Sequence, residues 1–190
     1  MTTISPRRLA AGLLLIPAVA AFAGGWAAIT VEDLPDHLVA GQPVSLEFTV
    51  RQHGVSPLKG LEPRVEARGR GRPVRVVATP AGAVGRYRAT LNVPEAGDWT
   101  LAIHSGFGNS RVTLMPIPAL APGAAPVALT EGERGRRLFV AKGCVSCHVH
   151  RGVEGRGVYA VGPELTDRPL APDYLARFLA DPPRSPSRWW

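Results

Sequence analysis

The clearest pattern in the chain is an alternation of apolar and polar residues between residues 44 and 50. Every second residue of this segment is apolar: Val44, Leu46, Phe48 and Val50. Successive side chains of a β-strand point to opposite faces, so these four would share one face. The pattern predicts a strand with one face buried in a core.

Similar short runs recur up to residue 115. They lie at 26–31, 64–67, 74–78, 87–93, 99–103 and 112–114. Turn-forming glycine and proline separate them, most clearly at 40–43 and 94–98. About seven short strands with this spacing predict a small antiparallel sandwich of the immunoglobulin-like kind. We therefore assign residues 24–115 to an all-β domain.

Four short motifs of this segment give it a family resemblance. They are the sequences at 42–44 (Gln-Pro-Val), 60–61 (Gly-Leu), 85–87 (Gly-Arg-Tyr) and 97–99 (Gly-Asp-Trp). In this order they resemble the YtkA-like or FixH-like β-sandwich modules. The resemblance implies the fold and a loose association with haem-copper oxidase assembly or metal handling. It assigns no role to any residue.

The alternation stops at residue 116, and a different composition follows. Residues 116–129 contain four prolines and no charge, a composition that opposes helix and sheet and predicts an extended linker. Thr130 then has the position of an N-cap, with Glu131 and Glu133 in the first helical turn. Gly135 and Phe139, four residues apart, would share one face of this helix. A helix is therefore expected between the linker and residue 143.

The strongest chemical signal comes directly after that helix. The two cysteines of the chain, Cys144 and Cys147, are followed at once by His148. Two thiols at this spacing can each add to one vinyl group of a haem, and the adjacent imidazole becomes the proximal iron ligand. This arrangement predicts one covalently attached haem c, held by Cys144 and Cys147, with His148 on the iron.

Two other interpretations of these residues are weaker. A structural zinc site could use both cysteines with His148 or His150, but it needs four ligands, and the sequence has no second Cys/His pair. A redox-active dithiol of the thioredoxin kind would lie in a βαβ context, which this segment lacks. Haem attachment explains the pattern best.

The residues that follow resemble the class I cytochrome c family. Gly162-Pro163-Glu164-Leu165 is similar to that family's Gly-Pro-x-Leu turn, and 172–182 to the short helix after it. The resemblance implies that the carbonyl of Pro163 accepts a hydrogen bond from His148, and that residues 130–190 form a small all-α cytochrome c-like domain. The expected second helix has an apolar face that would cover the haem edge, formed by Tyr174, Leu175, Phe178 and Leu179.

The sixth ligand of the iron is not identified by the sequence. The methionines of the chain, Met1 and Met115, both lie outside the position where the family carries its ligand. We expect that the cytochrome segment is truncated at its C-terminus. The alternatives are a ligand from a partner or from a different group, and a five-coordinate haem.

The first residues have the pattern of an export signal. Arg7 and Arg8 precede an uncharged apolar stretch that ends in Ala-Phe-Ala at 21–23. Residues 1–23 are therefore expected to be a signal peptide. Extension of the apolar stretch to Ile29 would make it long enough to span a membrane, so an uncleaved anchor is the alternative. In both cases the rest of the chain is expected to be periplasmic or extracytoplasmic, with membrane contact through the N-terminal segment.

The composition of the chain excludes several classes of function. The net charge of +7 is spread along the chain without a basic tract, which argues against a nucleic-acid surface. His37, His53 and His104 have no short ligand spacing and do not predict a copper site. No pattern of a catalytic acid, base or nucleophile is present, so an electron carrier is expected rather than an enzyme. Its partners would be redox proteins, such as a respiratory complex or membrane oxidase; the alternative is a haem-bearing redox or gas sensor, or an assembly or metal-handling factor.

Overall fold

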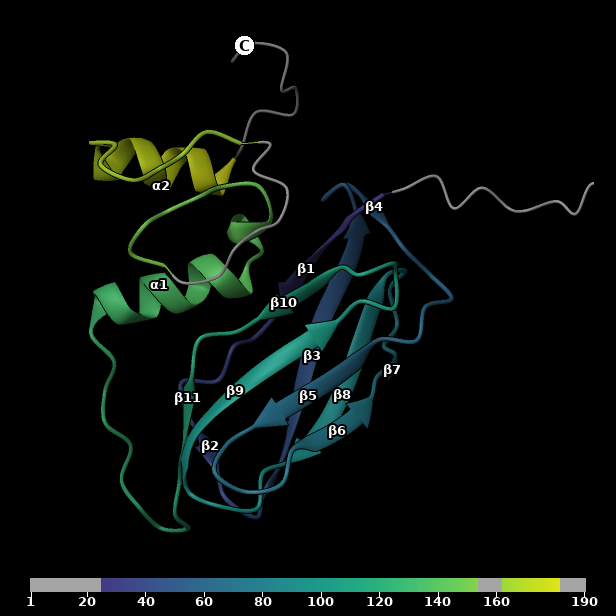
Figure 1. Ribbon diagram of the computed structural model, residues 1–190. Coiled ribbons are helices and arrows are strands. Elements are labelled where there is room, and N and C mark those ends of the chain that lie inside the picture. The colour runs from purple at the N-terminus through teal and green to yellow at the C-terminus, as the bar shows by residue number, and fades with distance from the viewer. Residues whose placement is uncertain (1–24, 154–161, 182–190) are drawn as a thin grey trace, which may run out of the picture.

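The computed structural model describes residues 25–153 and 162–181 (Figure 1). In these ranges, strands dominate the architecture. Their bounds are β1 Ala27–Val31, β2 Leu38–Val39, β3 Pro43–Gln52, β4 Ser56–Pro57, β5 Arg64–Arg68, β6 Val74–Val77, β7 Thr79–Pro80, β8 Arg86–Asn92, β9 Gly97–His104, β10 Arg111–Thr113 and β11 Ile117–Leu120.

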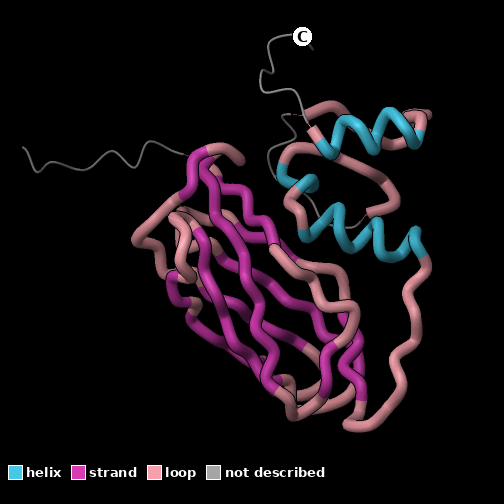
Figure 2. The backbone as a smooth tube through the Cα atoms, turned by 180° about the vertical axis from the view of Figure 1, so that it is seen from behind, coloured by secondary structure: helices cyan, strands magenta, loops and turns pink. Residues whose placement is uncertain are grey.

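The strands form two sheets that pack face to face as a β-sandwich. The first sheet has the order β1-β3-β8-β7, with β4 paired to β3, and the second has the order β2-β11-β9-β5-β6, with β10 paired to β9. All pairs are antiparallel except β2 with β11. Figure 2 shows the sheets from behind, with the helices gathered on one side of the sandwich.

The alternating apolar residues of the strands fill the space between the sheets. Leu46, Phe48 and Val50 of β3 are all at most 1% exposed. Tyr87 and Trp99 are the largest of the other buried side chains. Their polar atoms are satisfied, since Tyr87 donates to the Leu58 carbonyl at 2.9 Å and the indole of Trp99 donates to the Glu95 carbonyl at 2.9 Å. The alternation of apolar and polar residues along each strand is sufficient to place these residues in the core.

Part of the segment expected to be a linker is a strand. β11 covers residues 117–120 and pairs with β9 on one side and β2 on the other. Pro118 has no N–H to donate to a neighbouring strand. The strand tolerates it, because the pairing of β11 with β2 begins only at the next residue, Ala119. Residues 121–130 contain neither helix nor strand and lead to the first helix.

The prediction of a separate all-α cytochrome c-like domain is wrong. Beyond the sandwich, the described residues form two short α-helices, α1 (Glu131–Ala141) and α2 (Pro172–Ala180), and the 3-10 helix η1 (Cys144–Ser146). α2 buries no residue, and the side chains that α1 and η1 bury belong to the core of the sandwich. The physical reason is size: so short a segment cannot enclose a core of its own and relies on the neighbouring sheets.

The proposed N-terminal signal, residues 1–23, lies outside the described residues. Among the helices of the described ranges, none has the length and apolar character needed to span a membrane.

Candidate functional site

The helix α1 begins where the sequence predicts. Thr130 forms a capping box with Glu133: the threonine hydroxyl accepts from the Glu133 amide, and the Glu133 carboxylate accepts from the amide and the hydroxyl of Thr130. These bonds also lower the pKa of Glu133. The capping box satisfies amide groups that a helix end would leave unpaired. It fixes the start of the segment that carries the cysteines.

The end of α1 is packed into the sandwich. Val140, Ala141 and Val145 are each at most 5% exposed and belong to the same apolar cluster as the strands. α1 contacts β1 and β10, beside which it lies in Figure 1. Gly143 has a φ of +76°, and a Cβ on it would lie 3.0 Å from the carbonyl oxygen of Ile29. The chain approaches β1 this closely because residue 143 is glycine.

Polar contacts hold the same helix to the strands. The ammonium group of Lys142 donates to the carbonyl oxygens of Val31 at 2.8 Å and Glu32 at 2.5 Å. Near the start of α1, Arg134 forms an ion pair with Asp36 at 2.6 Å, and Arg137 donates to the Asp36 carbonyl at 2.9 Å. Contacts at both ends of α1 therefore set its position on the sandwich.

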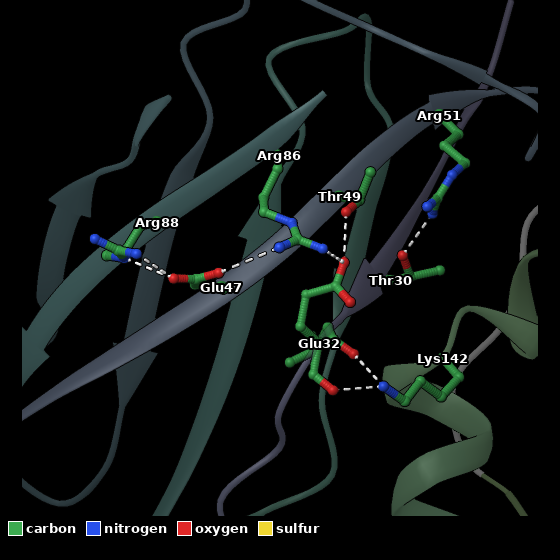
Figure 3. Close-up of polar contacts among 9 residues, drawn as sticks. Thr30, Glu32, Glu47, Thr49, Arg51, Arg86, Arg88 and Lys142 are labelled. Carbon is green, nitrogen blue, oxygen red and sulfur yellow. Dashed lines mark hydrogen bonds and ion pairs between the residues drawn. The ribbon is translucent and has the colours of Figure 1, made fainter. Parts of the chain in front are cut away.

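Lys142 lies at the end of a charged network on the outer face of the first sheet (Figure 3). The carboxylate of Glu32 accepts from the Thr49 hydroxyl at 2.6 Å and lies 3.7 Å from the guanidinium of Arg86. Arg86 also lies 4.0 Å from Glu47, which pairs with Arg88. Glu32 joins the two sets of contacts, because its carboxylate belongs to this network and its backbone carbonyl accepts from Lys142.

The cysteines lie in and next to η1. The amides of Cys147 and His148 both donate to the Cys144 carbonyl, at 3.1 and 2.9 Å, so the motif forms one tight turn. Both thiols are free and half-buried. Burial raises the pKa of Cys144 and of Cys147 above the ordinary value. The thiols are therefore protonated near neutral pH in the chain without a bound group.

The imidazole of His148 contacts the segment that begins at Gly162. Its Nδ1 lies 2.9 Å from the carbonyl oxygen of Pro163. Because a carbonyl can only accept, Nδ1 is the donor in this contact, which in the neutral form of the ring leaves Nε2 with its lone pair. A Cβ on Gly162 would lie 2.7 Å from Cε1 of His148. Gly162 thus leaves room for the ring in this orientation.

Backbone bonds join the two segments on either side of this contact. The amide of Gly162 donates to the Cys147 carbonyl and that of Leu165 to the Val149 carbonyl, both at 2.8 Å. The hydroxyl of Thr166 accepts from the Arg151 amide at 2.9 Å. The turn from 162 to 166 therefore clamps the residues that follow η1.

Apolar side chains near this site remain exposed. Tyr174 and Phe178 of α2 stack at a centroid distance of 5.9 Å and are 38% and 36% exposed, and Leu179 is 69% exposed. On the side of α1, the rings of Phe139 and His150 make an edge contact at 6.2 Å. The apolar face expected on α2 is formed, but none of the helix residues is fully buried.

The other candidate ligands are placed elsewhere. Met115 is half-buried against the sandwich core. His53 contacts Trp26, and His104 lies at the end of β9. In residues 25–153 and 162–181, no group of three or more histidine, cysteine or carboxylate side chains could hold a metal ion.

Several positioning residues were not identified from sequence. Lys142, Asp36 and Thr166 act through contacts between residues that are distant in the chain, which no local pattern reveals. Gly143 is the exception: a glycine after a helix is a common signal for a left-handed residue.

Comparisons with known proteins give no family for the chain. No protein-family model and no curated protein matches it. Among solved structures, a variant of the superoxide reductase (neelaredoxin) from Ignicoccus hospitalis is similar over 49% of this chain and 80% of that chain, with 21% identity and a TM-score of 0.31. A likeness this distant carries no inference about activity.

Proposed function

We propose that this protein carries one haem c, attached covalently through Cys144 and Cys147 with His148 as proximal iron ligand, and that it transfers single electrons. The observation that carries the proposal is the contact between His148 Nδ1 and the Pro163 carbonyl. Histidines that bind metals almost always donate their other ring N–H to such an acceptor, which leaves Nε2 free for the metal. Here that ring follows directly on two free thiols.

The donor set fits haem better than the alternatives. A catalytic dithiol has a lowered pKa, whereas burial raises the pKa of both thiols here. A zinc site would need further ligands, and the described residues offer no such cluster. The exposed aromatic pair on α2, Tyr174 and Phe178, is suited to contact an apolar macrocycle.

Bound haem would supply the one-electron redox chemistry of its iron. The protein would fix the tautomer of His148 through Pro163 and hold the attachment turn through Lys142 and the buried Val145. In this proposal the β-sandwich is the support of the attachment segment, since α1 and η1 bury their apolar residues in its core. The electron donors and acceptors would be redox proteins outside the cytoplasm, including a respiratory complex or membrane oxidase.

Covalent attachment is tested by producing the full chain as an exported protein in a host that has c-type haem attachment machinery. We expect the haem to stay with the polypeptide after acid-acetone extraction and after denaturing electrophoresis. Cys144→Ser with Cys147→Ser should abolish this signal. The proposal is overturned if the wild-type chain purified from this host carries no covalent haem and both of its thiols can be alkylated.

The role of His148 is tested separately. His148→Ala should keep the covalent haem but change its absorption spectrum, whereas the control His150→Ala should leave the proximal ligation intact. Identical spectra of His148→Ala and the wild type would exclude His148 as the ligand.

A second candidate function is a haem-bearing redox or gas sensor or an assembly factor. Met115 packs on the sandwich rather than in the attachment segment, and the described residues assign no sixth ligand. A reduced absorption spectrum with a sharp, split band pattern would indicate six-coordinate low-spin iron and favour electron transfer. A broad high-spin spectrum that shifts on addition of carbon monoxide would favour the sensor.

A further inference from the structure

The outer face of the second sheet carries an unusual row of cationic residues. His104 of β9 lies directly opposite Arg64 of β5 on one side and Arg111 of β10 on the other. In the next row, Glu66 of β5 lies opposite Arg75 of β6. All of these side chains point away from the core, because their neighbours along each strand are the ones that face inward.

Positive charge dominates these rows. The glutamate is shared between two arginines, since Glu66 lies 2.9 Å from both Arg68 and Arg75. Burial alone would raise its pKa, but these guanidinium groups outweigh that effect and lower it. Within the described ranges, neither Arg64 nor Arg111 has an ion-pair partner. The row through His104 is therefore left without a compensating anion.

The row through His104 contains no pair of opposite charges. Protonation of His104 would place like charges directly opposite each other on neighbouring strands, an arrangement that destabilises a sheet. Partial burial lowers the pKa of His104, and the charges of Arg111 and Arg64 lower it further, against a smaller opposing effect of Glu66. The surroundings of His104 thus disfavour its protonation and favour the binding of an anion. A groove of about 260 Å³ elsewhere, between α1 and the residues that follow β1, is lined by three carboxylates and three cationic side chains and lacks this imbalance.

A groove lies over β5, β6 and the end of β9. It has a volume of about 210 Å³ and is lined by Arg64, Glu66, Arg75 and His104 together with Val76 and Val77. Val77 is 64% exposed and lies opposite Arg64 on the edge strand β6. Guanidinium groups bind carboxylates through paired N–H donors, and the exposed valine adds an apolar contact.

We propose that this face, formed by Arg64, Arg68, Arg75, His104 and Arg111, is a docking surface for a partner protein with clustered carboxylates. Charge complementarity identifies the partner's chemistry. A protein surface fits better than an anionic membrane, because Glu66 lies among the arginines, only 14% of its side chain is exposed, and it forms ion pairs with two of them. A face of mixed charge suits a partner whose carboxylates are spaced to meet the arginines. The surface lies on the sandwich and does not require haem.

The proposal is tested with the full chain and poly-L-glutamate as the acidic probe. We expect binding that weakens with salt, and Arg64→Gln with Arg111→Gln should weaken it by about tenfold. The control, Arg51→Gln with Arg88→Gln, removes the same charge from the opposite sheet and should have little effect. Equal losses in the two double variants would show non-specific attraction and overturn the proposal.

The histidine provides a second, site-specific readout. Because a bound carboxylate favours protonated His104, the probe should raise the pKa of His104 measured by NMR, and binding should strengthen as pH falls through that pKa. His104→Gln should remove this pH dependence. Vesicles that contain anionic lipid form the last arm: binding to vesicles but not to poly-L-glutamate, lost in the Arg64/Arg111 variant, would assign the face to a membrane and overturn the proposal of a protein partner.

Discussion

The ammonium group of Lys142 lies 2.8 Å from the carbonyl oxygen of Val31, a residue 111 positions earlier in the chain. The same group reaches the Glu32 carbonyl, and the next residues, Gly143 and Cys144, begin the attachment turn. A strand of the sandwich therefore fixes the position of the segment for which we propose haem attachment. Four predictions follow from this relationship and from the contacts around it, beginning with the lysine itself.

Replacement of Lys142 should loosen the attachment turn. Lys142→Met removes the donor to both carbonyls and should lower the free energy of unfolding by about 1 kcal/mol, since the group is partly exposed to water. It should also reduce the amount of covalent haem per chain. Chemical denaturation and haem quantification measure the two effects.

Lys142→Arg keeps the charge and the donors and should restore haem content. Arg136→Met removes an exposed cation of the same helix and should change neither quantity. If Arg136→Met and Lys142→Met lower haem content equally, the contact with β1 is not the cause.

Substitution of Gly162 should move the proximal imidazole. In Gly162→Ala the new methyl group would lie 2.7 Å from Cε1 of His148, closer than carbon atoms approach. We expect the ring to turn away from Pro163, with a change in the absorption spectrum and the reduction potential of the haem protein. Gly135→Ala is the control, because nothing lies within 4 Å of a Cβ at that helical position. An unchanged potential in Gly162→Ala would mean that the ring tolerates the methyl group.

The close approach of Gly143 to β1 predicts a measurable loss of stability. Gly143→Ala combines a left-handed backbone, with a φ of +76°, and a Cβ 3.0 Å from the Ile29 carbonyl oxygen. Gly60→Ala has a similar φ of +72° but no atom within 4 Å. Backbone strain alone costs about 1 kcal/mol, so Gly143→Ala should be the more destabilising of the two. Thermal denaturation compares them, and equal losses would show that contact with β1 contributes nothing.

The raised pKa values of the two thiols predict how the stability of the chain without haem depends on pH. Burial raises the pKa of Cys144 and Cys147, so alkylation by iodoacetamide near neutral pH should be slower than in the urea-unfolded chain. The folded state keeps these protons to a higher pH than the unfolded state does. The corresponding stability is complete below the unfolded pKa, about 8.5, and is lost as pH rises through the folded value.

Urea unfolding at a series of alkaline pH values measures this loss. The double variant Cys144→Ser with Cys147→Ser should reduce the dependence of the free energy of unfolding on pH. Faster alkylation in the folded chain than in urea would show the opposite, an activated dithiol, and would count against haem attachment.

The local features of the chain could be predicted from the order of its residues. Strict alternation placed Leu46, Phe48 and Val50 in a core, because side chains of a strand point to opposite faces whatever the fold around them. Thr130 and Glu133 marked the start of α1, since a capping box needs only four consecutive residues. The spacing of Cys144, Cys147 and His148 likewise identified the candidate site without a structure.

The elements against which these features pack could not be predicted in this way. The sequence predicted a second all-α domain, but Val140, Ala141 and Val145 are buried in the sandwich, and α2 buries nothing. Apolar periodicity shows which face of a helix is buried and does not show which element covers it. The contacts of Lys142 with β1 and the row Arg64–His104–Arg111 depend in the same way on strand order and register. They join residues far apart in the chain, and only the folded sheets bring those residues together.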